Sequence, residues 1–240
     1  MKIKPNYGYM KNQNDINEQM RAILVDWIIE VHYNYNLKEE TLFQTIWIID
    51  TYLSYEIIPR TKLQLLGITS LLIACKFNEV LYPTFKEFIN MTNKAYEIKE
   101  LLEMEIRIVN KLNFNILVPT SLQFYDILSK MLNFDKKQYY LGLYFMESCL
   151  IDYDMIYFSW SIIALSCAYI VSKFFNIKEY KILYSINDNK NYIIQENMIK
   201  ESARQLCFLV KNLNHTNLVS IKKKYSLEKF GNIARYCQNY

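Results

Sequence analysis

Two charged residues interrupt apolar stretches of the sequence and would need a specific partner if they were buried. Arg21 lies within the run Met20–Val25, and Asp50 lies within Thr45–Leu53. Removing one member of a buried ion pair costs about 3–5 kcal/mol, so a buried charge rarely stands alone. We therefore expect Arg21 and Asp50 to pair with each other and to join the two helices that carry them. This role is structural and not catalytic.

Lys76 and Glu105 form a second candidate pair. Lys76 ends an apolar helical stretch, where the helix dipole favours a cation, and the turn Leu81-Tyr82-Pro83 follows it. Glu105 belongs to a later helical stretch and is a candidate to lie beside it. The pair is either an ordinary surface ion pair, worth at most about 1 kcal/mol, or part of a partner-binding surface. The residue types alone do not decide between these two interpretations.

Motifs for catalysis or metal binding are missing from the sequence. The two histidines, His32 and His215, lie far apart, and neither H-E-x-x-H nor G-x-S-x-G occurs. The five cysteines include no C-x-x-C, and no cysteine and histidine set has the spacing of metal ligands. The four glycines are scattered, so no Gly-rich loop could hold a phosphate. We expect no enzyme activity, no metal and no cofactor.

The composition is typical of a folded intracellular protein with a large core. Of the 240 residues, 52% are hydrophobic and 15% aromatic, which excludes disorder, and the net charge of +4 does not demand a nucleic-acid partner. The cysteines lie mostly in apolar stretches and no signal peptide opens the chain. The apolar segment Met155–Val171 contains three serines and is short for a bilayer span, so we interpret it as a buried helix.

Apolar residues recur at helical spacing along the whole chain, and prolines fall between the helical stretches. The pattern predicts an all-α protein with two five-helix repeats. The predicted helices of the first half are 16–35, 38–55, 60–78, 84–91 and 96–112, followed by an extended connector. Those of the second half are 121–132, 136–152, 157–175, 177–184 and 192–213. We divide the chain into a lead-in segment (1–15), a first repeat (16–117), a second repeat (118–215) and a polar C-terminal tail (216–240).

The third helix of each half is apolar nearly all round, which is typical of a central helix wrapped by others. The segment Ile73-Ala74-Cys75-Lys76-Phe77 ends this helix in the first half, and Ile170-Val171-Ser172-Lys173-Phe174 ends it in the second. The first helix is unusual because it is apolar on two faces. Such a helix is either fully enclosed or keeps one face for a partner, and the pattern alone favours enclosure.

The segment Met20-Arg21-Ala22-Ile23-Leu24-Val25-Asp26-Trp27 resembles the signature of cyclins, specifically the mitotic A and B types. The segment just before it, with Gly8-Tyr9-Met10-Lys11, is more similar to A-type than to B-type cyclins. Further matches are Glu40-Thr41-Leu42, Ile49-Asp50, Lys62-Leu63-Gln64-Leu65, Lys76-Phe77 with Glu79, Met104-Glu105, Leu112-Asn113-Phe114 and Pro119-Thr120. This resemblance runs from Tyr7 to Tyr125 and implies tandem cyclin folds, each with five helices around a central apolar helix.

The resemblance implies a non-catalytic regulatory subunit that binds and allosterically activates a cyclin-dependent kinase during the cell cycle, in the nucleus and cytoplasm. The family's characteristic Arg, Asp, Leu, Lys and Glu match Arg21, Asp50, Leu65, Lys76 and Glu105. In the family the Arg and Asp form a buried pair, and the Lys and Glu hydrogen-bond the kinase. The implied kinase-binding residues are Lys76, Glu105, Phe77, Ile73, Leu112, Phe114 and Ile116.

The resemblance also implies a docking patch for Arg-x-Leu motifs of substrates or inhibitors. Its residues would be Met20, Ile23, Leu24, Trp27, Glu30, Leu63 and Gln64, with Glu30 receiving the arginine of the motif. Asn78 departs from the family, because many cyclins have a glutamate there. The lead-in segment also leaves out most of the helix that precedes the cyclin box in the family.

A tandem cyclin-fold transcription factor that binds nucleic acid and polymerase machinery is the alternative. It predicts a basic face on the second repeat, whereas the compact basic run Lys222-Lys223-Lys224 lies in the predicted tail and is typical of a solvated segment. A purely structural helical scaffold would leave Lys76 and Glu105 unexplained. We expect a kinase and Arg-x-Leu proteins as partners, and neither nucleic acid nor a membrane.

Overall fold

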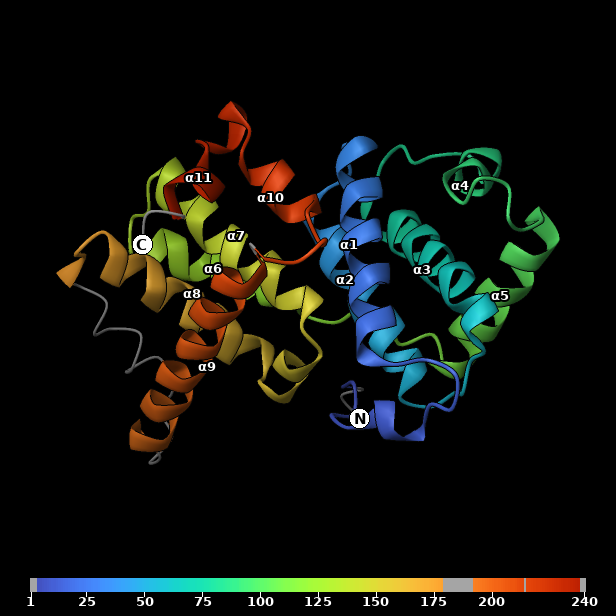
Figure 1. Cartoon of the computed structure of the whole chain (residues 1–240), viewed down its shortest axis with the longest axis horizontal. Helices are drawn as coiled ribbons and strands as arrows, with labels where there is room; N and C mark the ends of the chain where they lie inside the picture. The colour runs from blue at the N-terminus through green and yellow to red at the C-terminus, as the bar shows by residue number, and fades with distance from the viewer. Residues whose placement is uncertain (1–3, 179–191, 214, 238–240) are drawn as a thin grey trace. The chain divides into compact units, whose positions relative to one another are not determined.

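The structure, a computed structural model, describes residues 4–178, 192–213 and 215–237. The chain divides into two compact units, Met1–Val118 and Pro119–Tyr240, coloured from blue to green and from green to red in Figure 1. Helices and turns make up the described residues, and no β-strand occurs among them. The prediction of an all-α protein is confirmed. No helix in the described ranges is long and apolar enough to span a bilayer.

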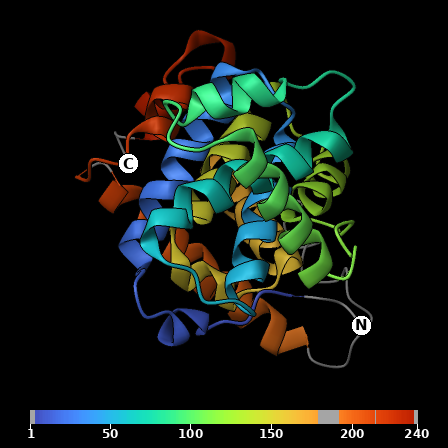
Figure 2. The same ribbon diagram turned by 90° about the vertical axis from the view of Figure 1, so that its right-hand side faces the viewer.

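The first unit contains five α-helices. They are α1 (Glu18–Asn34), α2 (Glu39–Leu53), α3 (Leu63–Asn78), α4 (Phe85–Met91) and α5 (Ile98–Lys111), with short 3-10 helices η1 (Tyr9–Asn12) and η2 (Arg60–Lys62). Helix α3 packs against α1, α2 and α5, and every residue from Leu65 to Cys75 is buried. Figure 2 shows this unit from the side of α4 and α5. The predicted central helix is therefore α3.

Local chemistry explains where these helices begin and how closely they pack. The Asn17 side chain accepts a hydrogen bond from the backbone N–H of Met20 at 2.9 Å and so caps α1. Thr84 and Glu87 form a capping box at the start of α4. Gly67 lets α1 approach α3 closely, because a Cβ at this position would lie 2.7 Å from Cδ1 of Leu24.

The second unit repeats this plan around α8. Its helices are α6 (Ser121–Met131), α7 (Lys136–Ile151), η3 (Tyr153–Tyr157), α8 (Trp160–Phe174), α9 (Tyr192–Leu213), α10 (Ser220–Tyr225), η5 (Glu228–Phe230) and α11 (Ile233–Cys237). Helix α8 packs against α6, α7 and α9. Lys76 and Lys173 lie in the last turns of the two central helices, α3 and α8. The predicted helix 177–184 falls almost entirely outside the described residues.

The prediction of a polar C-terminal tail is wrong for residues 220–234. Ile221 and Tyr225 are buried side chains on one face of α10, and Phe230 and Ile233 are buried after them. Lys224 is also buried, with its Nζ 2.6 Å from Oε1 of Glu147 on α7. The apolar residues of this segment are few but spaced at helical intervals, so they pack as part of the second unit instead of standing in solvent.

The lead-in segment is likewise part of the first unit. Gln13 is buried, and its Nε2 donates hydrogen bonds to the carbonyl oxygens of Leu53 and Glu56 at 2.9 and 2.7 Å. The backbone N–H of Asn6 donates to the hydroxyl of Ser54 at 2.9 Å. These bonds fasten residues 6–13 to the end of α2, where helix carbonyls lack partners within the helix.

Candidate functional site

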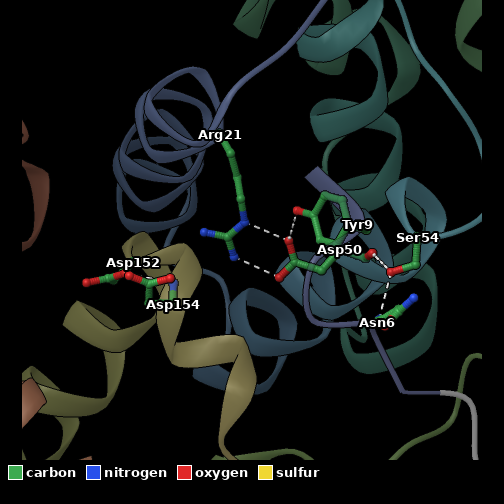
Figure 3. Close-up of polar contacts among 7 residues, drawn as sticks. All are labelled: Asn6, Tyr9, Arg21, Asp50, Ser54, Asp152 and Asp154. Atoms are coloured by element: carbon green, nitrogen blue, oxygen red, sulfur yellow. Dashed lines mark hydrogen bonds and ion pairs between the residues drawn. The ribbon is translucent and has the colours of Figure 1, made fainter. Parts of the chain in front are cut away.

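Arg21 and Asp50 form a buried ion pair that joins α1 to α2 (Figure 3). The Arg21 Nε and Nη2 donate to Oδ1 and Oδ2 of Asp50, each at 2.7 Å, which is a bidentate geometry. Arg21 is only 1% exposed. Burial by itself lowers the pKa of the guanidinium, but the charge and hydrogen bonds of Asp50 raise it by more, so the net pKa is raised. Arg21 therefore stays charged and serves as a structural tie.

Tyr9 is a third member of this cluster that the sequence analysis did not predict. Its hydroxyl donates to Oδ1 of Asp50 at 2.8 Å, and the side chain is 1% exposed. Gly8, with a φ of 96°, starts the turn that directs Tyr9 toward α2. The sequence feature that could have indicated this contact is a glycine immediately before an aromatic residue in the polar lead-in segment.

Lys76 and Glu105 meet at the surface of the first unit. The Lys76 Nζ lies 2.5 Å from Oε1 of Glu105, and the two side chains are 33% and 17% exposed. The same ammonium lies over the Phe85 ring, 5.4 Å from its centroid. Contacts from α4 and α5 thus hold the end of the Lys76 side chain in one place, with part of it open to solvent.

Large apolar side chains are exposed at the C-terminal ends of α3 and α5, the two helices that carry this pair. Phe77 directly follows Lys76 and is 51% exposed, and Phe114 follows α5 and is 73% exposed. Phe114 has a φ of 58°, a left-handed conformation that is unfavourable for a bulky residue. Val80, Leu81 and Leu117 add further exposed apolar surface. We call Lys76, Phe77, Glu105, Phe114 and Leu117 the pair surface.

The structure corrects three of the predicted kinase-binding residues. Ile73, Leu112 and Ile116 are only 3%, 0% and 6% exposed, so they belong to the core and offer no contact area to a partner. They position the surface instead. Gln44 donates to the carbonyl oxygen of Ile116 at 3.0 Å and accepts from Asn78 Nδ2 at 2.5 Å. This chain ties the connector that carries Phe114 to the end of α3.

Gln44 and Glu79 are further functional candidates; the sequence analysis did not name Gln44 and named Glu79 only as part of a matching motif. The Glu79 carboxylate accepts a hydrogen bond from the backbone N–H of Lys38 at 2.8 Å and from the hydroxyl of Thr41 at 2.5 Å. It thereby holds the end of α3 against the start of α2. Their polarity was visible in the sequence, but the partners lie about forty positions away, at separations of 41, 38 and 34 residues.

The predicted docking patch is only partly at the surface. Ile23 is 54% exposed, Glu30 is exposed, and Met20, Trp27 and Gln64 are partly exposed. Leu24 and Leu63, each 5% exposed, are corrections, because Leu24 packs onto Gly67 between α1 and α3 and Leu63 also turns into the core. Helix α1 therefore buries Val25, Ile28 and Ile29 and keeps a second, accessible face, so full enclosure is wrong. We call Met20, Ile23, Trp27, Glu30 and Gln64 the α1 patch.

Metal ligands and reactive thiols do not gather in the described part of the chain. No group of three histidine, cysteine or acidic residues there could hold a metal ion. Cys75, Cys149 and Cys167 are buried thiols that form no disulfide, and burial raises the pKa of the Cys75 thiol to about 12. A neutral, inaccessible thiol of this kind is not a nucleophile at physiological pH.

Comparison with known proteins places both units in one family. The model of the cyclin N-terminal domain matches residues 1–117, and that of the cyclin C-terminal domain matches residues 119–239. The chain belongs to the cyclin family. This cyclin is 38% identical to cyclin-B2-4 of Arabidopsis thaliana over 234 residues, which are 97% of the chain and 53% of that protein. It is 37% identical to G2/mitotic-specific cyclin-1 of Medicago sativa subsp. varia, with the same coverage.

These relatives support the mitotic group that the sequence predicted. Cyclin-B2-4 carries a B-type name and G2/mitotic-specific cyclin-1 names no type, so the finer preference for A-type cyclins, which depended on the short segment around Gly8, gains no support from them. The cyclin spans about half the length of the curated relatives it matches.

Solved structures show the same fold. A viral cyclin from herpesvirus saimiri superposes with a TM-score of 0.72 at 16% identity, covering 85% of this cyclin and 93% of that chain. A chain of the CAK complex from Chaetomium thermophilum superposes with a TM-score of 0.60 at 13% identity, covering 94% and 74%. The prediction of tandem cyclin folds is confirmed.

Proposed function

We propose that this cyclin is a regulatory subunit that binds and allosterically activates a cyclin-dependent kinase in mitosis, acting in the nucleus and cytoplasm. The observation that carries the proposal is the pair surface. A partly exposed ammonium and carboxylate, Lys76 and Glu105, lie 2.5 Å apart, Phe77 directly follows Lys76 and is exposed, and Phe114 is exposed on the same unit. Exposed aromatic residues around a fixed charge pair are typical of the anchors of a protein interface.

The chemistry of the pair suits the backbone of a kinase helix. A lysine ammonium has three hydrogens to donate, so its bond to Glu105 leaves capacity for partner carbonyl oxygens. The second carboxylate oxygen of Glu105 is an acceptor for a partner N–H. Docking would stabilise the kinase conformation whose helix C turns inward, where a lysine and a glutamate of the kinase position ATP. Activation is then a population shift, set by the cyclin's higher affinity for the active conformation.

Binding experiments with charge-deleted variants test this proposal. Lys76→Ala and Glu105→Ala should each weaken affinity for the cognate kinase by about tenfold or more, since each removes charge-assisted hydrogen bonds. The matched control is the Lys62–Glu100 pair of the same unit, also 2.5 Å long, whose alanine variants should bind normally. Unchanged affinity of both Lys76→Ala and Glu105→Ala, measured by calorimetry, would exclude the pair surface as the kinase-binding site.

The α1 patch supports a second part of the proposal, the recruitment of Arg-x-Leu substrates or inhibitors. Exposed Ile23 and partly exposed Trp27 offer an apolar contact surface for the leucine, and Glu30 offers a carboxylate for the arginine. A fluorescent Arg-x-Leu peptide should bind the wild-type chain and bind Trp27→Ala and Glu30→Gln more weakly. Ile127→Ala removes an equally exposed apolar side chain from the second unit and should change nothing. Equal binding by Trp27→Ala and wild type would refute the patch.

The nucleic-acid alternative gains little from the compact basic run of the second unit. That run is Lys222-Lys223-Lys224, and Lys224 is buried in its ion pair with Glu147. Two exposed lysines at most remain for phosphate contacts, whereas DNA-binding surfaces use many.

A further inference from the structure

A hollow of about 590 Å³ lies between α8 and α9 in the second unit, open to solvent. Its floor is apolar and includes Ile170, Phe174 and Ala203. Three cations, Lys173, Lys200 and Arg204, are among its lining residues, and none of the lining residues that the structure describes is a carboxylate. None of these residues belongs to the pair surface or the α1 patch. The hollow is therefore complementary to a ligand that has both an apolar part and negative charge.

The three cations come from both helices. Lys173 is on α8, while Lys200 and Arg204 are one turn apart on α9. The pKa of Lys200 is raised, first by its hydrogen bond to Glu196, and the positive charge of Lys173 acts in the opposite direction. Glu196 and Glu201 partner Lys200 and Arg204 along the exposed side of α9, at 2.6 and 3.1 Å. Each of these exposed ion pairs contributes less than about 1 kcal/mol. Lys200 and Arg204 can therefore leave the two glutamates and bind the carboxylates of a ligand.

The hollow occupies a place that corresponds to the pair surface of the first unit. Lys76 and Lys173 stand at equivalent positions in the last turns of the central helices α3 and α8. In the first unit the lysine meets Glu105 on α5, a carboxylate. In the second unit the long helix packed against the central one is α9, which presents Lys200 and Arg204. The two repeats therefore offer equivalent places with different charge, and each fits a different partner.

We propose that the α8–α9 hollow is a docking site for an acidic segment of a partner protein, in which a large apolar side chain is flanked by aspartate or glutamate. The apolar side chain occupies the floor, and the flanking carboxylates accept charge-assisted hydrogen bonds from the three cations. A lipid chain fits less well, because an acyl chain needs an enclosed channel and this hollow is open. The proposal stands independently of kinase activation, since it uses only residues of the second unit.

Fluorescence anisotropy on the full chain tests the proposal with defined probes. The probes are fluorescein-labelled peptides of the type Glu-Asp-Phe-Asp-Glu, with the phenylalanine moved through each position. Two control series replace the acidic residues by their amides or the phenylalanine by serine. At least one acidic probe should bind saturably with a dissociation constant of about 100 μM or lower, and both replacements should weaken it about tenfold.

Variants of the chain locate the site. Lys200→Glu and Arg204→Glu should each weaken binding about tenfold or more, and Ala203→Trp should abolish it by filling the hollow. Lys211→Glu, on the exposed side of the same helix and outside the hollow, is the matched control. Circular dichroism checks that all four variants fold. Absence of saturable binding up to about 1 mM, equal loss with Lys211→Glu, or binding of laurate or duplex DNA instead of the peptides would overturn the proposal.

Discussion

Replacing Asp50 by asparagine should destabilise the first unit strongly. Asp50 accepts two hydrogen bonds from Arg21, both 2.7 Å long, and a third from the Tyr9 hydroxyl at 2.8 Å. Asparagine is nearly the same size but carries no charge, so the variant leaves Arg21 as a buried cation without compensation. We expect the free energy of unfolding to fall by about 3–5 kcal/mol. That loss is a large share of the roughly 5–15 kcal/mol that stabilise a typical domain.

Urea unfolding measures this change in one unit at a time. Of the three tryptophans, Trp27 and Trp47 lie in the first unit and Trp160 lies in the second. In a Trp160→Phe background, tryptophan fluorescence therefore follows the first unit alone. With a slope of about 2–3 kcal/mol per molar, the midpoint for Asp50→Asn should fall by about 1–2.5 M urea.

Two further variants separate the buried pair from ordinary surface charge. Arg60→Ala breaks the exposed Arg60–Asp15 pair, 2.9 Å long, and should cost less than about 1 kcal/mol. Arg21→Met combined with Asp50→Leu removes both charges and should recover part of the stability that Asp50→Asn loses. The reasoning is refuted if Asp50→Asn unfolds within about 1 kcal/mol of the wild type, or no more easily than Arg60→Ala.

Three other expectations follow from single contacts. Lys224→Met should lower the free energy of unfolding of the second unit by about 3–5 kcal/mol, because it leaves the fully buried Glu147 carboxylate without its cation. Lys223→Met, at an exposed position, should change that free energy by no more than about 0.5 kcal/mol. Similar urea midpoints for the two variants would contradict this expectation. Gly142→Ala should lower the free energy of unfolding by about 1–3 kcal/mol or more, because the new Cβ would lie 1.8 Å from the Tyr125 hydroxyl oxygen. Adding Tyr125→Leu to this variant should restore part of the lost stability. An unchanged urea midpoint for Gly142→Ala would contradict the close contact. Burial raises the pKa of the Cys75 thiol from 9.0 to about 12, so the folded state keeps its proton and the contribution of Cys75 to stability is lost as the pH rises from 9.0 toward 12. At pH 8, mass spectrometry should find Cys75 alkylated by iodoacetamide only after unfolding, and rapid native labelling would argue against its burial.

The helices from α1 to α9 and the Arg21–Asp50 pair could be predicted from the sequence, whereas α10 and α11 were not predicted. Apolar spacing of about 3.6 residues and the positions of the prolines locate helix ends to within a few residues. Two opposite charges inside apolar runs are expected to pair, because an uncompensated buried charge is costly in any fold. The prediction that Arg21 and Asp50 pair rests on that requirement alone, and their atoms lie 2.7 Å apart.

Other parts of the site depend on contacts that no local pattern records. Tyr9 reaches Asp50 across 41 positions from a segment that reads as polar. Leu24 and Ile23 are neighbours in one apolar helix, but only the approach of α3 at Gly67 buries the first and leaves the second exposed. Lys224 lies in a basic run that suggests exposure. It can be buried because its ammonium pairs with Glu147, a residue 77 positions earlier.

The proposed function is tested most directly by kinase activity. The full chain is mixed with purified monomeric cyclin-dependent kinases, and phosphorylation of histone is measured with ATP. The wild-type chain and Lys62→Ala should stimulate at least one kinase strongly, and the double variant Lys76→Ala/Glu105→Ala should lose most of that stimulation at equal concentration. Equal stimulation by the double variant and the wild type, or no stimulation of any kinase by the wild type, would contradict the proposal.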